Sequence, residues 1–341
     1  MTFDNTQPHP SDALSLTELT FYHQIMAYRA AEGLDAIPLS LGLTTTAGRH
    51  AADTTYNIWE ARLDLPDGTD LRSWSDAPYF SDERDVSVMT QAPQRIGTGY
   101  SDAGYEIAAS GFLNSATALE EWKKFSGIND MLLNEGAWSI LDWDAIGIGI
   151  ETHATLPPIY YVWFGDAADS DGAPKISGTD AADTIEGTEF NDKITGGKDA
   201  DIITGGAGRD QINGGSGGDD LSGDGGGDRL IGKGGRDDLS GGGGKDKLIG
   251  GKGNDTLSGG AKSDLFIFSE ANFGKDRITD YNGDRVRITS AGEAQNEGEL
   301  TAALSEKNGN TIYDHGNDGQ NRIIFENTAL NDLDLSLFDL G

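Results

Sequence analysis

Apolar and polar positions repeat with a period of nine residues over the middle of the chain. The frame runs without interruption from Gly178 to Ile267 and holds ten units. The first position is always glycine, the sixth is always aspartate and the eighth is always apolar. A flexible glycine-rich linker would not keep aspartate and isoleucine or leucine in one register. The pattern therefore predicts a repeat architecture, in which each unit buries its apolar side chain against its neighbours.

Each unit combines a glycine-rich turn with a very short strand. Glycine readily adopts the positive φ angles that tight turns need. We expect positions seven to nine to form the strand, with the side chain at position eight pointing inward. Two units then complete one coil, so each unit stacks on the unit two places further along the chain.

The aspartates at position six come together when such coils stack. Neighbouring strands lie about 4.7–4.9 Å apart, and calcium–oxygen bonds are about 2.3–2.6 Å long. Aspartates of successive coils can therefore share a calcium ion, with turn carbonyl groups completing its shell. The predicted metal ligands form two rows, which are Asp183, Asp201, Asp219, Asp237 and Asp255 on one edge and Asp192, Asp210, Asp228, Asp246 and Asp264 on the other.

The repeat resembles the G-G-x-G-x-D-x-U-x nonapeptide of the RTX (repeats-in-toxin) family, where U is an apolar residue. The resemblance implies a parallel β-roll that binds Ca²⁺. Glycine fills position four only from Gly208 to Gly253. We therefore expect the sites at the two ends, at Asp183 and Asp264, to be weaker than those between them.

Residues 1–165 have the composition of a conventional domain with a hydrophobic core. All six tryptophans lie there, whereas the repeat is almost free of aromatic residues. Ser15 and Glu18 predict a capping box at the start of a helix that Gly33 ends. Further helices are predicted over 44–57 and 116–124, and strands over "AIGIGIETH" and "PIYYVWFG". This order favours an α+β fold.

Several segments of this domain follow one another in the order seen in the CAP superfamily, which covers cysteine-rich secretory proteins, antigen 5 and pathogenesis-related proteins. They are "AGRHAAD", "GYEIAASG", "ALEEWKKFSGINDMLLN" and "AIGIGI". The resemblance spans about residues 14–165 and implies an α-β-α sandwich, often with a metal-holding cleft of two histidines and two acidic residues. His50 corresponds to the first histidine and Glu106 to one acidic residue. Ile128 stands where the second histidine is expected, so the cleft looks degenerate.

Three functions remain open for the N-terminal domain. It binds an unknown extracellular ligand or partner without catalysis, or it is a CAP-like hydrolase, such as a protease, that uses His50 and Glu106. A structural or adhesive cell-surface protein is the third. Each residue also has a structural interpretation, His50 as a helix residue packed on the sheet and Glu106 as a buried carboxylate held by backbone N–H groups. The metalloprotease motif H-E-x-x-H and the hydrolase motif G-x-S-x-G are both missing.

Charge and the termini complete the picture. The net charge of −32 argues against nucleic acid and anionic membranes as partners, because both are polyanions. The sequence contains no cysteine, and we expect neither a transmembrane segment nor an N-terminal signal peptide. Residues 166–177 read as a linker, and 268–341 as a β-rich cap that ends in an uncleaved signal for type I secretion. We therefore expect a secreted bacterial protein that engages the type I secretion machinery through its C-terminus.

Overall fold

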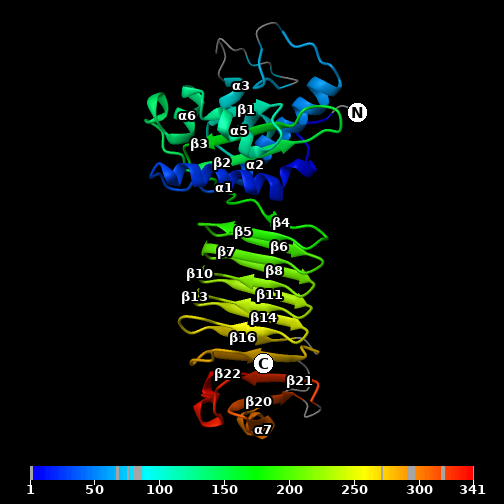
Figure 1. Cartoon of the computed structure of the whole chain (residues 1–341), viewed down its shortest axis with the longest axis vertical. Coiled ribbons are helices and arrows are strands. Elements are labelled where there is room, and N and C mark those ends of the chain that lie inside the picture. The colour runs from blue at the N-terminus through cyan, green and yellow to red at the C-terminus, as the bar shows by residue number, and fades with distance from the viewer. Residues whose placement is uncertain are drawn as a thin grey trace. The chain divides into compact units, whose positions relative to one another are not determined.

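A computed structural model describes residues 3–340 apart from 67–68, 75–76, 78, 80–86, 270–271, 290–295 and 316–318. The chain divides into two compact units, Met1–Lys175 and Ile176–Gly341 (Figure 1), which we call unit 1 and unit 2. The expected linker at 166–177 is shared between them. Gly172 accepts the Leu41 N–H at 2.8 Å inside unit 1, whereas Ile176–Ser177 forms the first strand of unit 2, β4.

Unit 1 contains the three helices that the sequence predicts and several short ones that it does not. Helix α1, Leu16–Ala31, starts with the expected capping box, in which Glu18 accepts the Ser15 N–H at 2.7 Å. The helix expected over 44–57 is α2, Leu41–Ala52, and it continues as the π-helix η2, Asp53–Glu60. The others are η1 (Pro10–Asp12), α3 (Ser87–Thr90), α4 (Ala92–Ile96), α5 (Ser115–Trp122), α6 (Ser126–Leu133) and η3 (Gly136–Trp138).

Three antiparallel strands form the sheet of unit 1, in the order β1-β3-β2. They are β1 (Gly104–Ser110), β2 (Ala145–Glu151) and β3 (Ile159–Gly165). Helix α2 lies directly on β2, because a Cβ at Gly147 or Gly149 would overlap with the helix backbone. The alternating glycines of "AIGIGI" thus permit a helix–sheet approach that larger residues would block.

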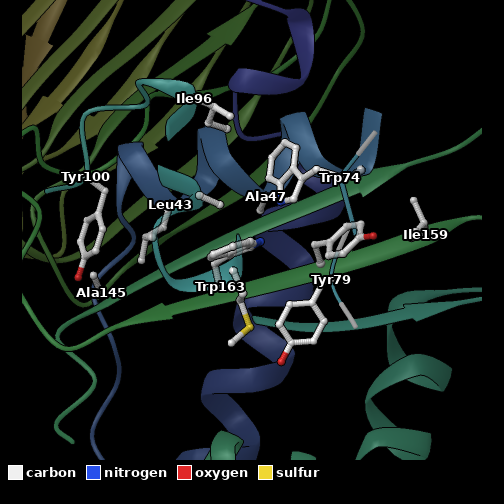
Figure 2. Close-up of a cluster of buried hydrophobic side chains, with 13 residues drawn as sticks. Leu43, Ala47, Trp74, Tyr79, Ile96, Tyr100, Ala145, Ile159 and Trp163 are labelled. Carbon is white, nitrogen blue, oxygen red and sulfur yellow. The ribbon is translucent and has the colours of Figure 1, made fainter. Parts of the chain in front are cut away.

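Helices pack on both faces of this sheet. On one face, Tyr161 and Trp163 of β3 join the cluster of buried side chains beneath α2 (Figure 2). On the other face, Tyr160 meets Phe21 of α1, with ring centroids 5.9 Å apart. Trp74, in a segment with no predicted element, is fully buried in the first cluster.

Unit 2 is a parallel β-roll, as predicted. Figure 1 shows its short strands stacked coil upon coil. Leu221 pairs with Ile203 before it and Leu239 after it, so one coil is two nonapeptides. Every apolar side chain at position eight is buried, with at most 2% of its surface exposed. The repeat therefore folds around a column of single apolar residues.

The strands of the roll belong to two sheets. One sheet holds β4, β6 (Lys193–Gly197), β8 (Gln211–Ser216), β11 (Arg229–Gly234), β14 (Lys247–Lys252), β16 (Leu265–Phe268) and β18 (Arg285–Ile288). The other holds β5 (Thr184–Thr188), β7 (Ile202–Gly208), β9 (Asp220–Ser222), β10 (Gly225–Gly226), β12 (Asp238–Ser240), β13 (Gly243–Gly244), β15 (Thr256–Ser258) and β17 (Lys275–Ile278).

The C-terminal segment continues both sheets and closes the roll. Strand β21 pairs in parallel with β17, and β22 pairs with β18. Strands β19, β20 and β21 form an antiparallel meander. No helix in the described part of the chain is long and apolar enough to cross a membrane. The elements are α7 (Glu297–Ala303), β19 (Leu304–Lys307), β20 (Asn310–His315), β21 (Asn321–Phe325), η4 (Leu330–Asp332), η5 (Leu335–Leu337) and β22 (Phe338–Asp339).

Candidate calcium-binding ladders

The aspartates at position six form two hydrogen-bonded ladders along the roll. In each ladder the backbone N–H of one aspartate donates to Oδ1 of the aspartate one coil later. Asp219, for example, donates to Asp237 at 2.9 Å, and Asp237 donates to Asp255 at 3.0 Å. We call the ladder that starts at Asp183 row A and the ladder that starts at Asp192 row B.

Both rows run one coil beyond the repeat seen in the sequence. Asp255 donates to Asp276, 21 residues later, and Asp264 donates to Asp284, 20 residues later, both at 2.9 Å. The expectation that Asp264 ends its row is therefore wrong. Inserted residues break the period of nine, which hid both aspartates from the repeat count. What remains of the repeat pattern in these turns is an aspartate two residues before an apolar strand residue, which is Ile278 for Asp276 and Val286 for Asp284.

The second carboxylate oxygen of the ladder residues is the chemically important atom. Among the residues that the structure describes, nine of these Oδ2 atoms are buried and have no hydrogen-bond partner. An unpaired carboxylate oxygen is costly to bury unless a cation accompanies it. The nine belong to Asp201, Asp210, Asp219, Asp228, Asp237, Asp246, Asp255, Asp264 and Asp276.

Glycine keeps the space beside these oxygens open. A Cβ at Gly232, position one of its unit, would overlap with Oδ2 of Asp237. At position two, Gly251 has φ +105°, and a Cβ there would overlap with the Lys233 carbonyl oxygen. Each turn is thus a cradle of oxygen atoms that a side chain would fill. Lys233 itself, with φ +77°, holds the left-handed conformation at position two without being glycine.

Burial raises the pKa of the ladder carboxyl groups from Asp201 onward, because a carboxylate loses hydration when it leaves water. Neighbouring carboxylates add to the rise in several of them, whereas the hydrogen bond from the backbone N–H opposes it. The pKa reaches about 6 for Asp228, Asp255 and Asp264, about 7 for Asp210 and Asp237, and about 9 for Asp276.

In the first coil, the Oδ2 atoms of the ladder aspartates have hydrogen-bond partners. Oδ2 of Asp183 accepts the backbone N–H of Thr179 at 2.6 Å and its hydroxyl at 2.9 Å. Oδ2 of Asp192 accepts the same two groups of Thr188 at the same distances. Both turns read G-T-x-x-x-D instead of G-G-x-G-x-D. The threonines thus supply hydrogen bonds to the oxygens that lack them in later coils.

The donor set of the later coils suits calcium. Calcium takes six to eight oxygen ligands from carboxylates and backbone carbonyls in flexible geometry, and residues 178–267 contain no histidine, cysteine or methionine. Within the described ranges, no cluster gathers three histidine or acidic side chains that could hold a metal by themselves. A cation here would therefore depend on backbone carbonyl groups as well as on the ladder carboxylates.

In unit 1 the structure brings His50 and Glu106 together. Nδ1 of His50 lies 2.9 Å from Oε2 of Glu106, and Nε2 donates to the Ser73 carbonyl at 3.1 Å. The imidazole is fully buried between Trp74 and Tyr161, with both ring centroids 4.1 Å away. Burial raises the pKa of Glu106. Because both ring nitrogens are engaged, neither is available to a metal or a substrate.

A pocket of about 570 Å³ lies beside Glu106. Ile128 and Met131 of α6 line it, together with Trp138 and Arg72. Ile128 therefore lines the same pocket as Glu106. His50 is not among the residues that line the pocket within the described part of the chain. In the described part of the chain, the partner of Glu106 is the His50 side chain and not the backbone N–H groups that the sequence suggested.

Comparison with known families identifies the repeat. Residues 177–212, 196–230, 213–248 and 231–266 each match the family described as RTX calcium-binding nonapeptide repeat in four copies. This part of the chain therefore consists of calcium-binding RTX repeats, and the prediction of Ca²⁺ as the cofactor is confirmed. The match ends before Asp276 and Asp284. No curated protein shows significant similarity to the chain.

Several solved structures show remote similarity to the chain. An extracellular lipase from Serratia marcescens is 16% identical with a TM-score of 0.29, and the match covers 51% of this chain and 41% of the lipase. A cysteine-rich secretory protein from Staphylococcus aureus is 14% identical with a TM-score of 0.29, covering 44% and 38%. A subunit of the Azotobacter vinelandii mannuronan C5-epimerase is 24% identical with a TM-score of 0.27, covering 47% and 79%. The chain thus spans about two fifths of the lipase, and its function rests on its own residues.

Proposed function

We propose that the protein is a secreted calcium-binding protein in which Ca²⁺ drives the folding of unit 2. The observation that carries this proposal is the set of nine buried Oδ2 atoms that lack a hydrogen-bond partner among the described residues. Their ladder holds Oδ1 fixed and leaves Oδ2 for a cation. Asp219, Asp237 and Asp255 would be typical ligands in row A, and Asp210, Asp228 and Asp246 in row B.

The energetic argument follows from the composition of the repeat. Residues 178–267 contain 17 acidic and 10 basic residues, and the rows bring the carboxylates close together. Glycine makes the unfolded chain entropically favourable, while the single apolar side chain buried at position eight of each unit offsets little of that cost. Bound calcium supplies positive charge between the carboxylates, so that binding and folding become one event. Extracellular calcium modules typically bind at about 10⁻⁴–10⁻³ M.

Hydrogen exchange of the full chain tests this proposal. In millimolar calcium, amides of the roll between 193 and 268 should be protected, and in chelator they should exchange as an unfolded chain does. Unit 1 is the internal control and should keep its protection in both conditions. Magnesium should not replace calcium, because it demands shorter bonds and octahedral geometry. Full protection of the roll in chelator would contradict calcium-driven folding.

Export by a type I secretion machinery is the second part of the proposal. RTX repeat proteins are typically secreted in this way, and a roll that needs extracellular calcium would stay unfolded in the cytosol. Truncation is a poor test, because removal of the last fifty residues also removes the strands that close the roll. A carrier protein fused to residues 268–341 separates the two roles. Retention of this fusion in cells that export a known type I substrate would count against the proposal.

For unit 1 we propose a CAP-like domain that binds an extracellular ligand without catalysis. The pocket beside Glu106 supports binding, since it combines the apolar Ile128, Met131 and Trp138 with the charged Arg72. The alternative is a hydrolase that uses His50 and Glu106, and the engagement of both imidazole nitrogens disfavours it. A hydrolytic activity that disappears in His50→Gln and Glu106→Gln while unit 1 stays folded would favour the alternative.

A further inference from the structure

Row A ends in a turn that lies outside the nine-residue period. Asp276 follows Asp255 by 21 residues, where the repeat has 18. The family match stops at residue 266 and does not reach this turn. The question is whether the turn has kept the features that make the earlier turns of row A suitable for calcium.

The backbone of the turn is paired as it is in the repeat. The N–H at position four of one coil donates to the carbonyl at position three of the next, as Gly235 does to Lys252 at 2.9 Å. Gly253 donates in the same way to the Phe273 carbonyl at 3.2 Å. Phe273 therefore occupies position three, and Gly274 occupies position four.

Gly274 also keeps the shape of the cradle. Its φ is +91°, and a Cβ there would overlap with the Gly253 carbonyl oxygen. Gly253 has φ +153° and the same relation to the Gly235 carbonyl oxygen one coil earlier. The sequence from Gly274 to Asp276 thus repeats the G-x-D half of the calcium turn, with a positive φ at its glycine and the same close approach to a carbonyl oxygen of the preceding coil.

The carboxylate of Asp276 is in the same state as those of the repeat. Asp276 is fully buried, and its Oδ1 accepts the Asp255 N–H at 2.9 Å. Its Oδ2 has no hydrogen-bond partner among the residues that the structure describes. The last aspartate of row B differs, because Oδ2 of Asp284 accepts the Asn282 N–H at 3.2 Å. The last carboxylate of row B is therefore hydrogen-bonded through both of its oxygens. Among the described residues, the last carboxylate of row A has one oxygen, Oδ2, without a hydrogen bond.

We propose that the turn at Asp276 is a further calcium site, with Oδ2 of Asp276 as its carboxylate ligand and carbonyl oxygens of the adjoining turns as additional ligands. This inference rests on the proposed calcium binding of the repeat. It gives calcium a direct influence on the cap, because Gly274 donates to Oδ1 of Asn321 at 3.0 Å and accepts the Arg322 N–H at 2.7 Å. Occupancy of this site stabilises the docking of β21 on β17.

The competing explanation is that Asp276 serves only as the acceptor for the Asp255 N–H. The variant Asp276→Asn separates the two explanations, since the amide oxygen still accepts that N–H while the amide nitrogen cannot bind calcium. Asp284→Asn is the matched control. Asp284 stands in the same coil and accepts the equivalent N–H from Asp264, but its second oxygen is already bonded.

The experiment is the anomalous difference map of crystals of the full chain grown in calcium. We expect a peak about 2.3–2.6 Å from Oδ2 of Asp276, kept in Asp284→Asn and lost in Asp276→Asn. Peaks along the rows from Asp201 to Asp264 with none at Asp276 would overturn this inference and leave the proposed function intact. A map without peaks on either row would overturn both.

A solution measurement covers the case in which a variant fails to crystallise. Hydrogen exchange of β20 and β21 in the full chain should show calcium-dependent protection that Asp276→Asn reduces at least tenfold and Asp284→Asn does not change. Equal protection of these strands in the wild type and in Asp276→Asn would overturn the link between this turn and the cap.

Discussion

Single atoms decide what each turn of the roll can do. Asp183 and Asp237 have the same position in the repeat, yet Oδ2 of Asp183 is bonded to Thr179 and Oδ2 of Asp237 is not. Thr179, at position two of its unit, donates its backbone N–H and its hydroxyl to Asp183, whereas position two in the turn of Asp237 is Lys233, which has no hydroxyl. The residue types around an aspartate, and not the aspartate alone, therefore define a calcium turn.

Glycine at position one should be as necessary as the aspartate. Gly232→Ala places a Cβ where Oδ2 of Asp237 lies, so we expect it to destabilise calcium-loaded unit 2 by about 1–3 kcal/mol. Gly234→Ala is the control, because a Cβ there has no neighbour within 4 Å. Thermal unfolding in calcium, followed by circular dichroism, measures both. Equal melting temperatures for the two variants would show that the close approach at Gly232 does not matter.

The pair of His50 and Glu106 makes a second prediction at this scale. Both side chains are fully buried, so removal of one partner leaves the other without its hydrogen bond. We expect His50→Ala to lower the stability of unit 1 by about 3 kcal/mol, through the lost hydrogen bonds and the cavity between two aromatic rings. Urea denaturation monitored by tryptophan fluorescence tests this, since every tryptophan lies in unit 1. A loss below about 1 kcal/mol would mean that the site relaxes around the change.

Among the elements, the first coil and the later coils should respond differently to the loss of a carboxylate. Asp237→Asn replaces a carboxylate oxygen that has no hydrogen bond among the described residues. We expect it to raise the calcium concentration for half-maximal folding by about tenfold, which corresponds to a loss of about 1.4 kcal/mol of binding free energy. Asp183→Asn should leave that midpoint unchanged, because Thr179 already satisfies the carboxylate. Calcium titration of the full chain by circular dichroism compares the two. A similar shift in both variants would mean that the threonine turn also binds calcium.

The elements also show what the sequence could predict. The period from Gly178 to Ile267 determines the strands, the buried side chains and the ten aspartates, because each feature recurs in register. The repeat pattern did not reveal Asp276 and Asp284, because they follow the preceding aspartates of their rows by 21 and 20 residues and not by 18. In unit 1 the capping box could be predicted, because it depends only on Ser15 and Glu18, which are three residues apart in the sequence.

The residues that line the pocket of unit 1 could be predicted only in part from the sequence. Its lining combines β1 and α6 with Asp70, Leu71 and Arg72, and this last group matches no pattern in the sequence. Contacts between segments so far apart depend on the tertiary fold. Motif order nevertheless pointed to Glu106 and Ile128, which the pocket does bring together.

At the scale of the whole molecule, unit 2 couples charge, protons and calcium. Burial raises the pKa of Asp210 and Asp237 to about 7 and that of Asp255 to about 6, whereas the pKa of an exposed aspartate is about 3.9. Protonation removes the repulsion within each row just as a cation would. Protons and calcium should therefore compete for the same carboxylates.

The pH dependence of the calcium-free chain follows from the sign of these shifts. Because the folded-state pKa values exceed the unfolded ones, the ladder carboxyls contribute stability that is fully present below about pH 4 and is lost as pH rises through about 6 to 7. In chelator, we expect unit 2 to be more stable at pH 5 than at pH 7.5. In calcium the order should reverse, because protons displace the metal at the lower pH. Melting curves at both pH values, with and without calcium, give the four values needed. A calcium-free roll that is equally unstable at both pH values would show that repulsion and burial of the ladder carboxylates do not keep unit 2 unfolded.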